Sequence, residues 1–331
     1  MVNSFDANDS NSSPNLDGEN IDLKATGGLN FRLDQGFTWL VYLFAATTVA
    51  TLFLMCLVIY HEAEPAVTKF GIGFLWGQDW DTGNENFGAL PYIYGTVVSS
   101  AIALILTVPV GLSIALVTSE DFLPSYVKAP IAFVIETISA IPSVIIGLWG
   151  IFVFIPVLEP MQQWIGSTLK FIPIFSTEYP AGNNMLTAGI VLSIMVIPTM
   201  AAISRDVLLV IPKELRSASM ALGGTRWETI FRVLLPAGFS GMVSAAMLAL
   251  GRALGETMAV VMVIGNSAQI SVSLLDPAYT IPAVLANEFA EAERGLHIGA
   301  LSYLGLILFV ITLIINIGAG LLVQWVGKKN K

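Results

Sequence analysis

Six long apolar segments separated by polar stretches dominate the hydropathy pattern of this chain. A helix needs about 20 mainly apolar residues to cross the roughly 30 Å of hydrocarbon in a bilayer. The segments that meet this requirement are residues 37–60, 93–118, 129–158, 185–203, 238–265 and 299–326. The pattern therefore predicts an all-α membrane protein with six transmembrane helices.

The remaining residues suggest how the chain is organised. Residues 1–36 are rich in Asn, Asp, Ser and Gly, a composition typical of disorder, and no small-residue cleavage box follows them. We predict a disordered tail over 1–36, a first span with an external segment over 37–92, a five-span block over 93–326 and a short tail over 327–331.

Charges are distributed unevenly across the predicted membrane. If both termini are cytoplasmic, eleven of the 15 Lys and Arg residues lie inside, three lie outside and Arg252 lies within a span. Cytoplasmic loops carry an excess of Lys and Arg, so we predict cytoplasmic termini. The outer loops then carry eleven acidic residues against three basic ones. This face should repel free anions, so an anionic solute would have to be delivered by another protein.

Composition excludes several classes of protein. The chain is 55% apolar and 12% charged, whereas soluble domains are about 45–50% apolar and about 25% charged. One cysteine, Cys56, and two histidines are too few for a disulfide framework or a His-rich metal centre. The net charge of -9 argues against nucleic acid. Because the chain has no GxxxxGK[ST] phosphate loop, we expect it not to hydrolyse ATP itself. We also predict no catalytic residue, no metal and no cofactor bound by this chain.

The loop at residues 204–237, between the fourth and fifth segments, has the pattern of a helical hairpin. An apolar stripe at helical spacing predicts a first short helix that Gly223 ends. Thr225 and Glu228 fit a capping box at the start of a second short helix, which we expect Pro236 to end. The pattern also fits an amphipathic hairpin that only anchors the neighbouring spans at the membrane interface.

Three charged residues fall inside predicted spans, where each costs at least about 2.5–3.5 kcal/mol on insertion scales. Arg252 lies near the centre of the fifth segment, with Glu256 one helical turn further along the same face. Either the two form an ion pair that locks the helices, or Arg252 offers its planar fork of donors to an oxyanion. Glu136, nearer the cytoplasmic end of the third segment, either lines a path or caps a helix broken before Pro142.

The hairpin loop resembles the EAA loop of binding-protein-dependent ABC importer permeases, Glu-Ala-Ala-x3-Gly-x9-Ile-x-Leu-Pro. The residues at its defining positions are Ser217, Ala218, Ser219, Gly223, Leu235 and Pro236. Ser217 stands in place of Glu, Ser219 in place of the second Ala and Val233 in place of Ile, whereas all spacings match.

Four further stretches resemble this family; the first resembles the opening of its permease domain, and the other three resemble its phosphate permeases. They are YGTVVSSAIALILTVPVGLSIAL (94–116), ETISAIPSVIIGLWG (136–150), GRALGETMAVVMVIGN (251–266) and ANEFAEAERGLH (286–297). The last two resemble the PstC type rather than the PstA type. In that family the arginine and glutamate that match Arg252 and Glu256 are functionally important, which favours the path over the ion pair. Glu256 would then hold Arg252 or accept a proton from a P–OH group.

The resemblance implies a MetI-like type I ABC importer permease fold, with coupling helices in the loop at 204–237 that dock on a cytoplasmic ATPase. It implies half of the path of an ATP-driven importer of inorganic phosphate in the bacterial inner membrane. The implied partners are a PstA-like permease, two PstB-like ATPases that use ATP-Mg and a PstS-like phosphate-binding protein.

Three alternatives remain. The permease could carry another oxyanion, such as phosphonate or molybdate. An ion-coupled secondary transporter often shows internal repeats and needs no docking loop, whereas this chain has such a loop and no repeat visible by eye. A membrane-embedded enzyme would show a cluster of His, Asp or Ser near one membrane face, and the sequence has none.

Overall fold

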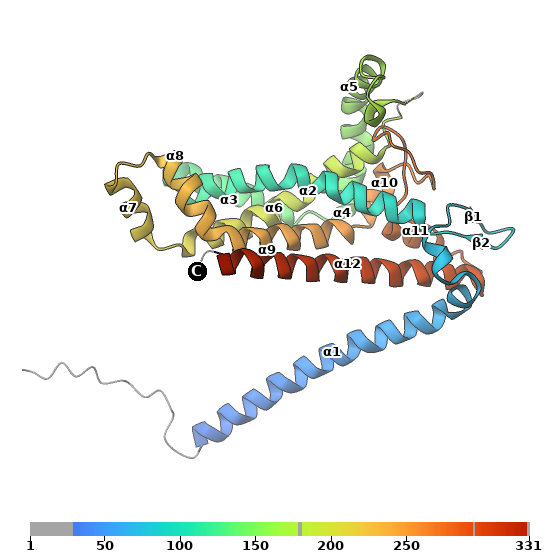
Figure 1. The fold of residues 1–331 in the computed structure, drawn as a ribbon, viewed down its shortest axis with the longest axis horizontal. Coiled ribbons are helices and arrows are strands. Elements are labelled where there is room, and N and C mark those ends of the chain that lie inside the picture. The colour runs from blue at the N-terminus through green and yellow to red at the C-terminus, as the bar shows by residue number, and fades with distance from the viewer. Residues whose placement is uncertain (1–28, 178–180, 294, 330–331) are drawn as a thin grey trace, which may run out of the picture. The chain divides into compact units, whose positions relative to one another are not determined.

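The computed structural model describes residues 29–177, 181–293 and 295–329, and these residues are mostly helical (Figure 1). In chain order the helices are α1 (Leu29–Phe70), α2 (Leu90–Ser119), α3 (Ser125–Ser139), α4 (Ser143–Trp149), α5 (Ile155–Thr168), α6 (Met185–Val210), α7 (Lys213–Ala221), α8 (Arg226–Thr229), α9 (Leu235–Leu254), α10 (Met258–Val263), α11 (Ile281–Glu288) and α12 (Leu296–Lys329). Two short antiparallel strands, β1 (Trp80–Asp81) and β2 (Asn86–Phe87), lie between α1 and α2.

Six helical stretches in the described part of the chain are long and apolar enough to span a membrane. They are Leu33–Leu75, Leu90–Ser119, Ser143–Thr168, Met185–Val210, Arg226–Leu254 and Leu296–Gln324. The predicted all-α fold with six transmembrane helices is therefore confirmed. The tail predicted over 1–36 lies mostly outside the described residues, although α1 already begins at Leu29.

The third predicted segment, residues 129–158, is not one continuous helix. α3 ends at Ser139, and α4 begins at Ser143 after Pro142. Proline has no amide hydrogen and disfavours helical backbone in the residue before it, so the helix breaks here. The helix break considered before Pro142 is therefore present, and the apolar span that follows it is Ser143–Thr168, which differs from the predicted bounds 129–158.

Pro236 does not end the second helix of the hairpin, contrary to our expectation. α8 continues through a π-helical turn, Ile230–Leu234, into α9, and the Leu235 amide donates to the Ile230 carbonyl in an i+5 bond. A proline inside a helix lacks one donor and crowds the carbonyl four residues earlier, and a wider turn relieves that conflict. The fifth span consequently begins at Arg226, well before the predicted start at residue 238.

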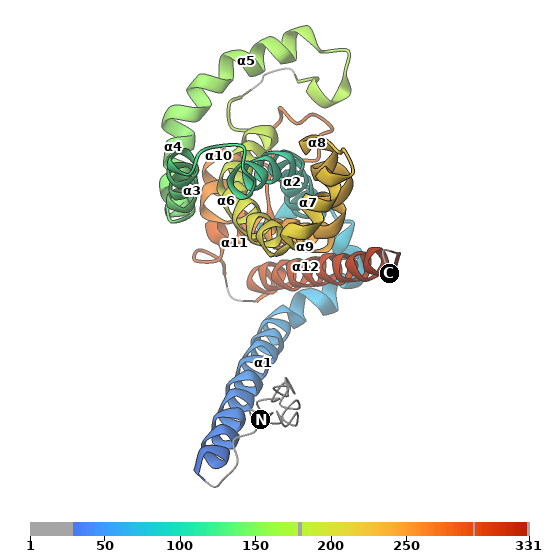
Figure 2. The ribbon, with the colours of Figure 1, turned by 90° about the vertical axis from the view of Figure 1, so that its left-hand side faces the viewer.

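By compactness the chain divides into two units, Met1–Met55 and Cys56–Lys331. In the first unit, the α1 side chains from residue 33 onward are exposed. In the second, α6 is the central helix and packs against α2 and α9 (Figure 2). Small residues allow this approach: a Cβ on Gly111 of α2 would lie 2.7 Å from Cγ of Met200 on α6.

A buried polar network attaches α5 to the start of α6. Gln162 of α5 donates to the Thr187 hydroxyl at 2.8 Å and accepts from Nδ2 of Asn184 at 2.9 Å. The Asn184 side chain in turn caps α6 by accepting from the Thr187 amide at 2.9 Å. All three side chains are fully buried, so their hydrogen bonds replace the water they have lost.

Candidate functional site

Arg252 lies in the last turn of α9, and its side chain reaches α6. Its Nη1 donates to the Thr199 hydroxyl oxygen at 3.0 Å. The side chain is exposed. Among the described residues, the bond to Thr199 is the one hydrogen bond found for the guanidinium. Most of its N–H groups are therefore available to a ligand.

Glu256 lies beyond the end of α9. The helix stops at Leu254, the chain turns at Gly255, and α10 begins only at Met258. Glu256 instead accepts from the amide of Ala259 at 3.4 Å, so it lies beside free N–H groups at the start of α10.

The sequence-based placement of Glu256 on the same helical face as Arg252 is thus wrong. Glycine is a poor helix former, and here Gly255 ends the helix before that face can continue. The ion pairs found among the described residues do not include one between Arg252 and Glu256.

Glu136 is exposed on α3 and lines a small cavity between α2, α3 and α6. Thr118 and Arg205 line the same cavity. The Nε of Arg205 is buried and has no hydrogen-bond partner among the described residues. Neither a pathway role nor a capping role for Glu136 is tested by this arrangement. Sequence reasoning had counted Arg205 only as a cytoplasmic charge and had not associated it with Glu136.

The hairpin between α6 and α9 has the turn and the cap predicted from sequence. α7 ends at Ala221, and Gly223 follows with φ +87°, the left-handed region that favours glycine. Thr225 and Glu228 form the reciprocal capping box, with the Thr225 amide donating to Glu228 at 2.9 Å. The Ser219 hydroxyl lies 2.9 Å from that of Thr229 and so joins the two helices.

The hairpin exposes many large apolar side chains. No residue of α7 is buried, and Ser217 and Ala218 both face solvent. Leu235 is half-buried and Pro236 exposed at the start of α9. The exposed large apolar residues of the hairpin are Leu215, Met220, Leu222, Trp227 and Phe231. Such a continuous set marks a surface that another protein or a membrane interface covers.

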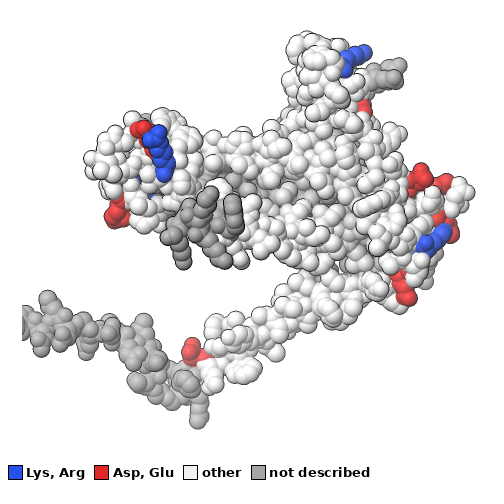
Figure 3. Space-filling view, in the orientation of Figure 1, with Lys and Arg blue, Asp and Glu red and all other residues white. Residues whose placement is uncertain are grey.

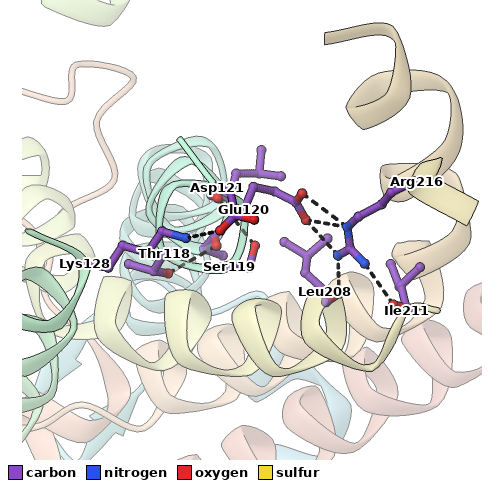
Figure 4. Close-up of polar contacts among 10 residues, drawn as sticks. Thr118, Ser119, Glu120, Asp121, Lys128, Leu208, Ile211 and Arg216 are labelled. Carbon is purple, nitrogen blue, oxygen red and sulfur yellow. Dashed lines mark hydrogen bonds and ion pairs between the residues drawn. The ribbon is translucent and has the colours of Figure 1, made fainter. Parts of the chain in front are cut away.

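Arg216 of α7 connects the hairpin to two membrane helices, a contact that no local sequence pattern indicates (Figure 4). Its guanidinium binds the carboxylate of Glu120, directly after α2, with the shortest N–O distance 2.7 Å. It also donates to the carbonyls of Leu208 and Ile211 at 2.9 Å each. Carbonyls at a helix end lack partners within the helix, so Arg216 satisfies the end of α6 as well.

The α2–α3 connection also contacts the hairpin. Lys128 donates to the Asp121 carboxylate at 2.9 Å, and this hydrogen bond holds the pKa of Asp121 below its usual range. Arg226 donates to the Asp121 carbonyl at 3.4 Å, and the rings of Phe122 and Trp227 lie 5.6 Å apart. A movement of the hairpin would therefore act on α2 and α3 together.

The opposite end of the second unit is acidic (Figure 3). Glu288 accepts from the Trp80 indole at 2.9 Å and lies 3.2 Å from Nε2 of His297, whose ring stacks on Phe87. These contacts join the β1–β2 hairpin to α11 and α12. The acidic residues that line the hollow here are Glu85, Glu288, Glu291 and Glu293. Two outer-loop charges in our orientation argument, Glu178 and Arg294, lie outside the described residues.

Six apolar helices with an exposed hairpin between the fourth and fifth define a multi-pass membrane permease, a transport component rather than a catalytic one. The family described as binding-protein-dependent transport system inner membrane component matches residues 107–331. The chain therefore belongs to this family.

The curated relatives specify the type of permease. The chain is 43% identical over 268 residues to the phosphate transport system permease protein PstC of Pasteurella multocida, covering 80% of this chain and 83% of the relative. It is 42% identical over 284 residues to PstC of Mesorhizobium japonicum, covering 82% and 86%. The resemblance to the PstC type is confirmed.

Solved structures show the same fold at low sequence identity. A bacterial ABC transporter involved in the import of the acidic polysaccharide alginate aligns with a TM-score of 0.55 at 15% identity, covering 89% of this chain and 99% of that one. The inward-facing MetNI methionine ABC transporter aligns with a TM-score of 0.51 at 17% identity, covering 71% and 96%. The predicted MetI-like type I importer fold is thus confirmed.

Proposed function

We propose that this chain is the PstC-type half of an ATP-driven inorganic phosphate importer. The observation that carries the proposal is the exposed guanidinium of Arg252, which donates to one neutral hydroxyl and, among the described residues, forms no ion pair with a carboxylate. A guanidinium presents a planar fork of donors that matches the oxygens of phosphate. Arg252 would bind the anion as it passes.

Glu256 supplies a basis for selectivity in this proposal. It is half-buried, lies four positions after Arg252 and forms no ion pair with that arginine. A carboxylate accepts hydrogen bonds, and phosphate at neutral pH carries a P–OH group that donates one. Sulfate has no such proton and would be repelled. Glu136 would belong to the path nearer the cytoplasm, beside Arg205.

The exposure of Arg252 also requires a partner. Arg252 lies in the last turn of the fifth span, Arg226–Leu254, and not near its centre as predicted from the sequence. A charged side chain inside a span is still costly when it faces lipid, so such residues face protein or a water-filled cavity. A PstA-like permease that covers this face of α9 would enclose the path between the two chains.

The hairpin would couple this path to ATP hydrolysis. Its exposed apolar residues, Leu222 among them, would enter a cleft on one of two PstB-like ATPases, which bind and hydrolyse ATP-Mg. Ser217 and Ala218 would lie in that contact, and Gly223 would set the angle of the turn. Arg216 would transmit the movement to α2 through Glu120 and to α6 through the carbonyls of Leu208 and Ile211.

Orientation and delivery follow from charge. We place the hairpin and both termini in the cytoplasm of a bacterium, with the chain in the inner membrane. The acidic end beside Glu288 would then face the outside, where a PstS-like phosphate-binding protein delivers the anion that this surface repels.

Reconstitution of the chain with its second permease and ATPase into liposomes tests this function. We expect phosphate uptake that requires both ATP and the loaded binding protein, and that Arg252→Gln lowers strongly, to a residual rate that can still be measured, without loss of assembly. Uptake driven by a proton or sodium gradient without ATP would contradict the proposal. Stronger transport of phosphonate or molybdate than of phosphate would contradict phosphate as the substrate and assign the stronger one instead.

A further inference from the structure

We infer that Thr199 is a positioning residue for the oxyanion-binding arginine. Thr199 lies midway along α6, directly after Pro198, and its hydroxyl oxygen accepts from Nη1 of Arg252 at 3.0 Å. The two residues are 53 positions apart and belong to different helices. The inference rests on the proposed role of Arg252 and adds the group that orients it.

The hydroxyl of Thr199 differs from those of four other helical threonines and resembles that of Thr107 on α2, which also bonds across helices, to the Ser193 carbonyl at 3.4 Å. Thr47, Thr96, Thr137 and Thr312 each donate to the carbonyl four residues earlier in their own helix. This is the usual local bond of threonine in a helix. Among the described residues, the side-chain hydrogen bond found for Thr199 is instead the one to Arg252. Its role in this structure is therefore between helices.

A neutral partner suits an anion-binding arginine better than an acidic one. A carboxylate on Arg252 would cancel its charge and occupy two N–H donors, and the anion would have to compete for them. A hydroxyl occupies one N–H and leaves the charge intact. An arginine side chain without any partner would populate several rotamers, so one bond that fixes the fork improves its alignment with the ligand.

The test compares Thr199→Val with Thr199→Ser in the reconstituted complex. Valine has the shape of threonine without the hydroxyl, and serine restores the hydroxyl. We expect Thr199→Val to lower phosphate moved per ATP hydrolysed about fivefold to tenfold, the size of one hydrogen bond. Thr199→Ser should recover most of that ratio. ATP hydrolysis stimulated by the loaded binding protein should change little in either variant.

A double-variant cycle shows whether Thr199 acts through Arg252. With Arg252→Gln already present, Thr199→Val should cause no further loss. Thr312→Val is the matched control, because its hydroxyl bonds only within α12. Normal transport by Thr199→Val, or an equal additional loss in the Arg252→Gln background, would overturn the inference. Normal transport by Arg252→Gln alone would instead overturn the proposed path.

Discussion

The guanidinium of Arg216 lies 2.7 Å from the carboxylate of Glu120, and both side chains are largely buried, with 18% and 15% of their surfaces exposed. The same guanidinium holds two carbonyls at the end of α6. The hairpin, α2 and α6 thus meet at one arginine. A force on the hairpin reaches the membrane helices through a short, charged and geometrically defined contact.

Breaking this contact should uncouple the permease. Arg216→Ala leaves the Glu120 carboxylate and two carbonyls without partners, at a cost of about 3 kcal/mol if the complex still assembles. We expect ATP hydrolysis to continue while phosphate uptake falls, measured side by side in proteoliposomes. Arg216→Lys should be impaired as well, since an ammonium lacks the fork.

A surface ion pair of the same hairpin serves as the control for Arg216. Arg232 lies 3.8 Å from Glu228, and its side chain is 79% exposed. Exposed pairs contribute little, so Arg232→Ala should leave coupling unchanged. Equal losses in Arg216→Ala and Arg232→Ala would mean that general damage to the hairpin, not the Glu120 contact, explains the effect.

The turn at Gly223 should be sensitive to any side chain. No atom lies within 4 Å of a Cβ built there, so the expected penalty of Gly223→Val comes from φ +87° and not from a clash. Left-handed backbone costs roughly 1–2 kcal/mol for a residue with a Cβ. We expect the six spans to insert normally and ATPase recovery on co-purification to fall. In Gly223→Asn the ATPase recovery should fall less, because asparagine tolerates left-handed backbone. Full ATPase recovery and normal uptake in Gly223→Val would argue against a docking role for the hairpin.

Removing the charges of Arg252 and Glu256 together should not restore transport. Since Arg252 and Glu256 are not paired, the double variant Arg252→Leu, Glu256→Leu should assemble yet fail to carry phosphate. Arg252→Lys keeps the charge without the fork and should be impaired. The measurement is uptake normalised to assembled complex. Wild-type uptake by the double variant would show that the path runs elsewhere.

The network at the start of α6 should contribute mainly to stability. Gln162→Leu leaves the buried Asn184 and Thr187 side chains short of partners, which costs about 1–3 kcal/mol. We expect a lower thermal midpoint of the detergent-solubilised complex. Gln163→Leu is the control, because Gln163 is exposed and bonds only Glu159 on the same helix. An equal shift in both variants would contradict this account.

Delivery of phosphate should depend on salt if the acidic outer end docks a basic partner surface. Glu291→Lys reverses one charge in the hollow beside Glu288, so a basic partner surface should dock there less well. Uptake should fall most at low ionic strength, where screening is weakest. The salt dependence of uptake with and without the binding protein measures this. Efficient uptake of free phosphate without a binding protein would contradict it.

Features that depend on neighbours along the chain could be predicted from residue patterns alone. Apolar length defines the six spans, because burial in lipid depends on composition over about 20 residues. The left-handed Gly223 turn and the Thr225–Glu228 cap each involve residues at most a few positions apart, so the local residue pattern was enough to predict both. The residues expected at the site, Arg252 above all, stood out because a charge in a span is costly and therefore rare.

The packing of whole helices determines which of these residues contact one another. The helix runs through Pro236 because a π turn there and its packing against neighbouring helices outweigh the local signal to stop. The helix end at Gly255 separates Glu256 from the α9 face that carries Arg252. The Arg252 guanidinium instead donates to Thr199, 53 positions earlier in the chain. Arg216 and Glu120 are 96 positions apart. Hydrogen bonds between groups so distant depend on how whole helices pack, which no local pattern of residue types encodes.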